Sequence, residues 1–212
     1  MAYDHQELEQ LDELKAWWKE YGNLVIFAAI GCALVIAAYQ GWRHYRYTQG
    51  VAAATLYEQL DQAERSGDRN KVRDLATQLT GNYGSTPYGA FAALSAARAS
   101  FESGDLADAK SRLTWVVENA REDAVKDIAR LRLAGVLLDE KNYAEALKWM
   151  ESKPVEAMTG LYADLKGDIL VAQGNRTEAR NAYQLALDKS ERGSPYRATI
   201  QLKLDSVGDK QQ

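Results

Sequence analysis

Two carboxylates, Asp164 and Asp168, are the side chains in this sequence whose spacing best suits shared chemistry. Residues four apart lie on one face of a helix, so both carboxylates would point the same way. Such a pair can exchange protons or hold a basic group of a partner, although a solvated helix face is the more common reason for it. A catalytic interpretation needs further reactive groups beside the pair.

Histidine and cysteine do not supply those groups. The two histidines are His5 and His44, and the single cysteine, Cys32, lies inside a long apolar run. The chain after residue 48 therefore offers no histidine-based triad and no thiolate metal site. The string Gly81-Asn82-Tyr83-Gly84 follows no strand and precedes no Gly-Lys-Ser, so we interpret it as a linker rather than a phosphate loop. We expect no enzyme activity, cofactor or metal; an enzyme would need a site of Asp, Glu, Lys, Ser or Tyr alone.

Four similar turns recur after residue 48, and they indicate which kind of structure positions the polar residues. Their central residues are 67, 104, 141 and 174, which are 37, 37 and 33 positions apart, in the strings Ser66-Gly67-Asp68, Ser103-Gly104-Asp105, Glu140-Lys141-Asn142 and Gln173-Gly174-Asn175. Glycine can end one helix in the left-handed conformation, and Asp or Asn can cap the next. A period in the mid-thirties is typical of stacked helix hairpins of the tetratricopeptide type.

The residues around each turn fit close helix packing. Glu145 and Glu178 stand three places after Asn142 and Asn175, as in a capping box. Small residues recur on both helices of a hairpin, with large apolar residues beside them: Ala109, Ala146 and Ala179; Ala97, Ala134 and Gly167; Leu113, Met150 and Tyr183. Small residues allow two helices to approach and the large ones fill the remaining space. The fold class expected is all-α.

The expected helices after the apolar run are amphipathic and mostly short. Their ranges are 50–65, 69–80, 88–103, 105–120, 123–139, 143–151, 156–173, 175–190 and 195–206. In a tetratricopeptide register one face of the stack is concave and binds other proteins. The residues expected to point into that groove are Tyr57, Phe91, Leu94, Arg98, Asp164 and Asp168. The aromatic residues can also be explained as core.

A stretch of 22 residues without charge, 21–42, is long enough to cross a lipid bilayer as a helix. Tyrosine and tryptophan flank it on both sides, where they favour the headgroup region. A cleaved signal peptide would start basic, whereas this N-terminus is acidic. A buried core helix is usually shorter. We therefore expect a tail (1–20), a transmembrane helix (21–42), a juxtamembrane linker (43–50) and a repeat domain (51–212).

Charge counting leaves the orientation in the membrane open. Two lysines, Lys15 and Lys19, precede the apolar stretch and two arginines, Arg43 and Arg46, follow it, so the positive-inside rule favours neither side. Six acids and two lysines lie before the stretch, which leaves 24 acids and 24 bases of the 30 and 26 after it. A domain without basic excess is unlike a nucleic-acid binder.

The order of several short motifs is similar to a known family. They are Leu14-Lys15-Ala16-Trp17-Trp18-Lys19-Glu20-Tyr21-Gly22, then the apolar run, Gly41-Trp42-Arg43-His44-Tyr45, Tyr88-Gly89-Ala90-Phe91-Ala92-Ala93-Leu94 and Ala163-Asp164-Leu165-Lys166-Gly167-Asp168. Over nearly its whole length the chain resembles the YfgM family, the ancillary subunit of the SecYEG translocon of Gram-negative bacteria. Each motif alone is weakly specific, and their order and spacing carry the resemblance.

The resemblance implies an inner-membrane protein with a cytoplasmic tail and a periplasmic repeat domain. It implies partners as well: the lipid bilayer, the SecYEG translocon, a PpiD-like membrane-anchored periplasmic chaperone and exported client proteins. The implied role is an adaptor that passes newly exported proteins to periplasmic chaperones. The alternative from the residues alone is a structural scaffold of another envelope or cell-division complex.

Overall fold

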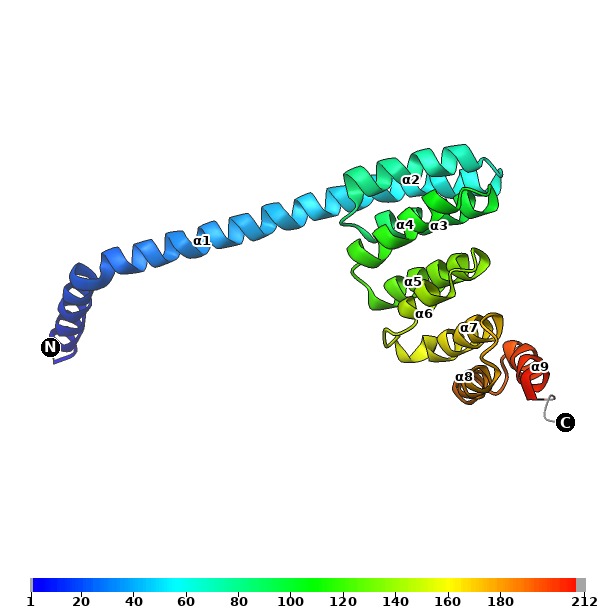
Figure 1. Ribbon diagram of the computed structural model, residues 1–212. Helices are drawn as coiled ribbons and strands as arrows, with labels where there is room; N and C mark the ends of the chain where they lie inside the picture. Colours follow the sequence, from blue (N-terminus) through cyan, green and yellow to red (C-terminus); the bar gives the residue numbers. More distant parts are fainter. Residues whose placement is uncertain (1, 209–212) are drawn as a thin grey trace. The chain divides into compact units, whose positions relative to one another are not determined.

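The computed structural model describes residues 2–208, and within that range every regular element is a helix (Figure 1). The elements are α1 (Ala2–Arg65), α2 (Arg69–Tyr83), α3 (Pro87–Glu102), α4 (Leu106–Asn119), α5 (Asp123–Asp139), α6 (Tyr143–Trp149), the 3-10 turn η1 (Glu156–Met158), α7 (Thr159–Ala172), α8 (Arg176–Lys189) and α9 (Tyr196–Gly208). The all-α prediction is confirmed. Residues 1 and 209–212, at the ends of the expected tail and repeat domain, lie outside the described residues.

The chain divides into two compact units, Met1–Gln49 and Gly50–Gln212, which we describe separately. The first unit lies within α1, the one helix among the described residues that is long and apolar enough to cross a membrane. Its large apolar side chains face outward; Phe27 is 73% exposed and Val35 is 69% exposed. Such side chains are unfavourable in water and favourable in lipid. Residues 43–50, expected as a linker, are helical and belong to α1.

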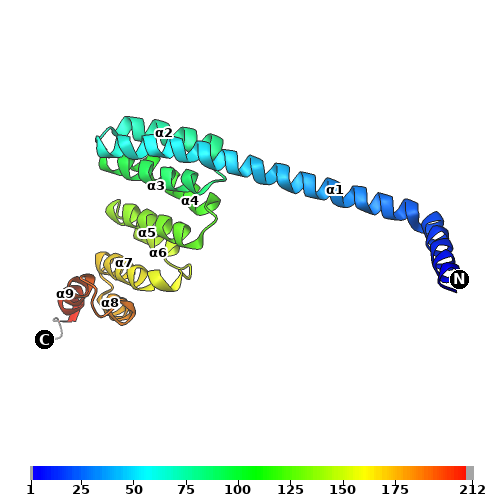
Figure 2. The ribbon, with the colours of Figure 1, turned by 180° about the vertical axis from the view of Figure 1, so that it is seen from behind.

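The second unit is a row of helix hairpins stacked in sequence order (Figures 1 and 2). Residues 50–65 of α1 pair with α2, α3 pairs with α4, α5 with α6, and α7 with α8, while α9 packs against α8 at the C-terminal end. The helices named here each bury one apolar face, as short amphipathic helices must. The predicted tetratricopeptide-like solenoid is confirmed.

Each hairpin turns through one residue in the left-handed region. Gly67, Gly104 and Gly174 have φ values of 73°, 81° and 86°, and Lys141 has 62° at the equivalent position. After Gly104, the N–H of Asp105 donates to the Ser100 carbonyl at 2.9 Å, which closes the preceding helix. Glycine adopts this conformation without a steric cost, whereas lysine adopts it only at a cost because of its Cβ. The third turn is therefore the strained one.

The expected caps form only at the first two turns. Asp68 accepts a hydrogen bond from the Lys71 N–H at 3.0 Å, and Asp105 accepts one from the Asp108 N–H at 3.1 Å. The side chains of Asn142 and Asn175 make no cap bond. Asn142 instead donates to the Glu145 carboxylate at 2.6 Å, so the capping-box prediction is wrong for the asparagine turns.

The small residues predicted at the helix contacts are all buried. Gly167 provides the clearest case, because a Cβ built there would overlap the ring of Tyr183 on α8. The buried apolar residues form three clusters: one between α1 and α3, one from α3 to α7, and one from α7 to α9. The core is thus divided along the stack, as expected when each repeat packs only on its neighbours.

Several helix boundaries differ from the expectation by one to three residues. The linker predicted at 81–84 is largely helical, because α2 continues to Tyr83 and the turn begins at Gly84. Helix α6 is only seven residues long and ends at Trp149. Pro154 lies between α6 and η1, where its missing N–H removes no helical hydrogen bond.

Candidate protein-binding groove

The first helices of successive hairpins line a pocket of about 560 Å³. Helices α3, α5 and α7 contribute most of it, with one residue from α4; the lining residues are Ala97, Arg98, Phe101, Leu113, Arg132, Gly135, Val136, Leu138, Asp139 and Leu165. We call this the groove pocket. Its size is within the range of sites that hold a few side chains of a ligand.

A glycine in the middle of a helix forms part of the pocket lining. Gly135 lies on α5, and a Cβ built there meets no atom within 4 Å. Glycine in a helix interior lowers helix stability by about 1 kcal/mol relative to alanine. At this position the missing side chain leaves open space that no neighbouring residue fills. Around it lie apolar side chains, including Phe101, which is 41% exposed. This floor can accept a bulky apolar group.

Arg132 brings a positive charge to the pocket. Its side chain is open to solvent, yet protein surrounds it closely enough that burial lowers its pKa, with repulsion from Arg98 as the next cause. Within residues 2–208 no carboxylate lies within the 4.0 Å ion-pair distance of this guanidinium. Glu64 attracts it only from farther away. Arg132 is therefore a cation available to a ligand.

Arg98, a predicted groove residue, also lines the pocket but has a partner. Its Nε donates to Glu102 at 2.8 Å, and Glu102 also accepts from Arg69 at 3.4 Å. The bond to Arg98 is the main reason that the pKa of the Glu102 carboxyl is lowered. The charge of Arg98 is thus largely balanced within the domain.

The three other apolar or aromatic predictions lie at the N-terminal end of the stack. Tyr57 stands 5.5 Å from Tyr88 and 6.4 Å from Phe91 between ring centroids. Phe91 is 40% exposed, whereas Leu94 is buried in the core at 7%. Burial, followed by repulsion from Glu64, raises the pKa of Tyr57. These aromatic rings form a cluster beside the groove pocket rather than in its lining.

Asp164 and Asp168 are engaged by the last helix. Lys203 of α9 donates to Asp164 at 2.9 Å and to Asp168 at 2.8 Å, and the Tyr183 hydroxyl donates to Asp168 at 2.8 Å. Burial raises the pKa of Asp164, and the bonds from Lys203 offset only part of this. For Lys203, burial lowers the pKa, but the two carboxylates outweigh it and the pKa is raised. This cluster attaches α9 to α7.

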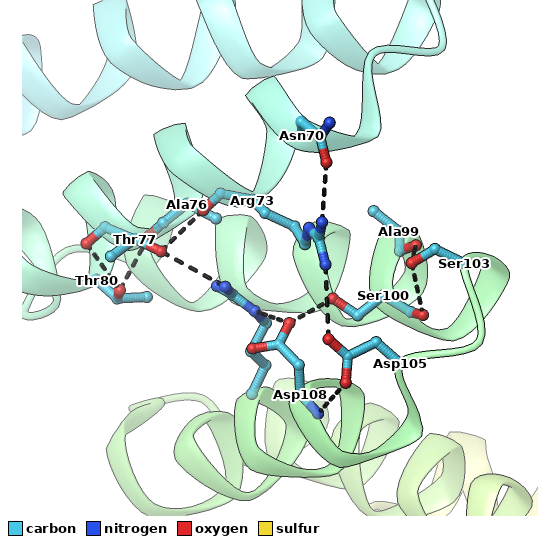
Figure 3. A network of polar contacts seen from close by, with 11 residues as sticks. Asn70, Arg73, Ala76, Thr77, Thr80, Ala99, Ser100, Ser103, Asp105 and Asp108 are labelled. Carbon is cyan, nitrogen blue, oxygen red and sulfur yellow. Dashed lines mark hydrogen bonds and ion pairs between the residues drawn. The ribbon is translucent and has the colours of Figure 1, made fainter.

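A second polar network joins α2, α3 and α4 away from the groove pocket (Figure 3). Asp108 accepts hydrogen bonds from Ser100 and, at 2.7 Å, from Arg112, while Arg73 lies 3.6 Å from Asp105. Every carboxylate and guanidinium drawn has a partner within the domain. This network stabilises the stack of the first hairpins and leaves no free reactive group.

Sequence reasoning missed the pocket residues Arg132, Gly135, Phe101, Leu138 and Leu165. The repeat spacing contained the signal, because Gly135 and Leu138 lie 37 positions after Arg98 and Phe101. An alignment of the repeats would have placed these four residues on the same face of the stack. In the searched part of the chain, residues 2–208, no three His, Cys, Asp or Glu side chains converge as a metal site.

Comparison with known proteins connects this architecture to a family. A family model described as a tetratricopeptide repeat-like domain matches residues 15–209. A protein of Neisseria gonorrhoeae named ancillary SecYEG translocon subunit is 31% identical over 209 residues, which cover 98% of this chain and 100% of that protein. The chain belongs to the YfgM family. An Escherichia coli K12 relative of the same name is 25% identical over 98% of this chain and 99% of the relative.

A solved structure supports the fold of this YfgM-family protein. MamA of Desulfovibrio magneticus, residues 41 to the end, aligns with a TM-score of 0.55 at 18% identity, covering 74% of this chain and 93% of MamA. At that identity the likeness concerns the fold alone. The apolar part of α1 and the family together make the YfgM-family chain a membrane-anchored protein with one span among the described residues.

Proposed function

We propose that this protein is a membrane-anchored adaptor beside the SecYEG translocon, which passes newly exported proteins to periplasmic chaperones. In this proposal residues 1–20 are cytoplasmic, 21–42 span the inner membrane and the repeat domain from residue 51 is periplasmic. The observation that carries it is an open groove pocket with an unpaired arginine on an otherwise charge-balanced repeat domain. The names of its relatives support the translocon as the neighbour.

Tethering explains how a modest groove can serve this function. A domain held close to the membrane meets the proteins leaving an export channel at a high effective concentration, so weak contacts suffice. Handing a client onward also requires weak contacts, because dissociation rates set residence times. The partners proposed are the translocon, a PpiD-like membrane-anchored chaperone and exported clients.

Photocrosslinking in native membranes tests the partners. A photoreactive phenylalanine replaces Phe101 in the groove pocket, and a matched probe replaces Gln78, which is exposed on α2 and does not line the pocket. We expect translocon or chaperone subunits to crosslink to position 101 and not to position 78. Absence of every such subunit from both positions, and from a pull-down at native expression, would contradict the proposal.

Cysteine labelling tests the orientation. The single native cysteine is removed by Cys32→Ser, and new cysteines are placed by Glu13→Cys and Arg180→Cys, both at exposed positions. With a membrane-impermeant maleimide and a permeabilised outer membrane, we expect Arg180→Cys to react in intact cells and Glu13→Cys only after lysis. The reverse pattern would place the repeat domain in the cytoplasm.

A further inference from the structure

On the side that lines the groove pocket, α5 carries a positive charge and, further along the helix, a negative charge. Arg132 and Asp139 both line the groove pocket, seven residues apart, which is about 10 Å along a helix. Between them lie Gly135 and Val136. Along this side of the helix a cation is therefore followed by open space, an apolar side chain and an anion. In the described part of the chain neither charged end has an ion-pair partner within 4.0 Å.

The walls of the pocket add the apolar half of a recognition site. Phe101 comes from α3 and Leu165 from α7, on either side of α5. A concave site with low-dielectric walls strengthens the attraction between Arg132 and a ligand carboxylate. Large apolar groups at the centre and charges at the rim are the usual arrangement of protein-binding hot spots.

We propose that the groove pocket binds an extended peptide segment of a protein partner, with an acidic side chain on Arg132, apolar side chains over Gly135 and a basic side chain near Asp139. An extended chain in the polyproline II conformation advances about 3.1 Å per residue and turns once every three residues, so the first and fourth side chains point the same way and lie about 9 Å apart, close to the distance between the two charges. The segment is thus acidic–apolar–apolar–basic. This inference rests on the proposed adaptor function and specifies the chemistry of its clients or partners.

Peptide binding to the full-length chain in detergent tests the charge pairing. The probe is a rhodamine-labelled, end-blocked peptide Gly-Ser-Glu-Leu-Phe-Lys-Ser-Gly, with a matched peptide carrying Gln in place of Glu, followed by fluorescence anisotropy. We expect Arg132→Gln to lower affinity for the Glu peptide about tenfold and to leave the Gln peptide nearly unchanged, because a charge-assisted hydrogen bond is lost only in the first pair. Equal effects on both peptides would overturn the pairing.

A second variant tests the location without removing a charge. Gly135→Leu fills the open floor, and a helical leucine should not harm folding, because the added Cβ meets nothing within 4 Å. Gly81→Leu adds the same side chain at an exposed glycine of α2, where a Cβ also meets nothing. We expect Gly135→Leu to lower affinity at least tenfold and Gly81→Leu to have no effect.

The two proposals can fail separately. If neither peptide binds the wild-type chain up to millimolar concentration, or if Gly135→Leu binds like wild type, this inference is wrong. Translocon crosslinks from position 101 in that case leave the adaptor function in place. Absence of translocon and chaperone subunits from both probe positions and from the pull-down would remove the adaptor function itself.

Discussion

The ring of Tyr183 occupies the space in which a side chain at position 167 would lie. Gly167 on α7 and Tyr183 on α8 are both buried, and the tyrosine hydroxyl donates to Asp168 at 2.8 Å. The ring therefore fills the gap between two helices while its polar end reaches the cluster around Lys203. Tyr183 therefore links the packing of the α7–α8 hairpin to the polar cluster that holds α9.

Enlarging Gly167 should destabilise the domain. In Gly167→Ala the new methyl overlaps the Tyr183 ring, and overpacking of this kind costs about 1–3 kcal/mol, more than the gain in helix propensity. Thermal unfolding of the full chain in detergent, followed by circular dichroism, measures it. Gly135→Ala is the control, since its methyl enters open space, and it should raise the melting temperature slightly. Equal melting temperatures for the two variants would contradict the packing described.

Relieving the strained turn should stabilise the domain. Lys141 has a φ of 62°, which glycine adopts freely, so Lys141→Gly should gain about 0.5–1 kcal/mol. The reciprocal change, Gly104→Lys, places lysine at the equivalent turn and should cost a similar amount. Chemical unfolding of both variants is the measurement, and shifts of the same sign would argue against strain as the cause.

Asp108 should make stability depend on pH in the acid range. Burial raises its pKa, but the bonds from Arg112 and Ser100 outweigh burial, so the pKa lies below its ordinary value of 3.8. A lowered pKa in the folded state stabilises above the unfolded value, and this contribution is lost as pH falls through the folded value. Asp108→Asn should therefore lower the free energy of unfolding by about 1–2 kcal/mol at pH 7, and by progressively less as the pH falls through the folded pKa.

Asp74→Asn is the matched control for that prediction. Asp74 is exposed on α2 and has no ion pair among the residues described, so the same change of charge should barely affect stability. Urea unfolding at pH 7, 4 and 3 compares the three proteins. A gap between wild type and Asp108→Asn that stays constant with pH would show that ionisation of Asp108 is not responsible.

Asp127 should be among the most sensitive positions in the domain. It is 2% exposed, and its carboxylate accepts hydrogen bonds from Arg130 and from the N–H of Val155, both at 2.8 Å. The Tyr162 hydroxyl donates to its carbonyl at 3.0 Å, and burial followed by the charge of Asp127 raises the pKa of Tyr162 to about 12. Asp127→Ala should cost about 3–5 kcal/mol, because Arg130, the Val155 N–H and the Tyr162 hydroxyl, which also lies 3.2 Å from the carboxylate, lose an acceptor.

Two further variants make the Asp127 prediction specific. Tyr162→Phe removes one hydrogen bond and should cost about 1–2 kcal/mol, and the double variant should cost less than the sum, because the side chains share a network. Asp123→Ala, at an exposed position of the same helix, should cost below about 1 kcal/mol. Additive losses in the double variant would indicate that the two residues act independently.

The periodic features of the chain could be predicted from sequence because they follow from local chemistry. Glycine at a turn favours the left-handed conformation and aspartate favours a helix cap, and small residues recur wherever two helices pack closely. Lys141 could not be recognised as strained, since the hairpin imposes its backbone conformation on an unsuited residue. Neither asparagine caps its helix: the side chain of Asn142 donates to Glu145 and that of Asn175 donates to Gln173.

The polar groups of the groove were harder to predict because their roles depend on partners distant in sequence. Asp164 and Asp168 have the spacing of a solvated pair, and only the docking of α9 brings Lys203, 39 and 35 positions away, to them. Whether they also contact a partner stays a prediction. Arg132 is the converse case, because its spacing in the sequence is not distinctive. It is available to a ligand because no carboxylate of the described residues lies within the 4.0 Å ion-pair distance.

The division of the core into three clusters means that the domain need not open all at once. Helices α8 and α9 can separate from α7 while the cluster from α3 to α7 stays closed, so amide protons in α9 should exchange with solvent sooner than those in α5. A repeat domain that loosens first at its C-terminal end can open there and close again while the rest of the stack stays folded.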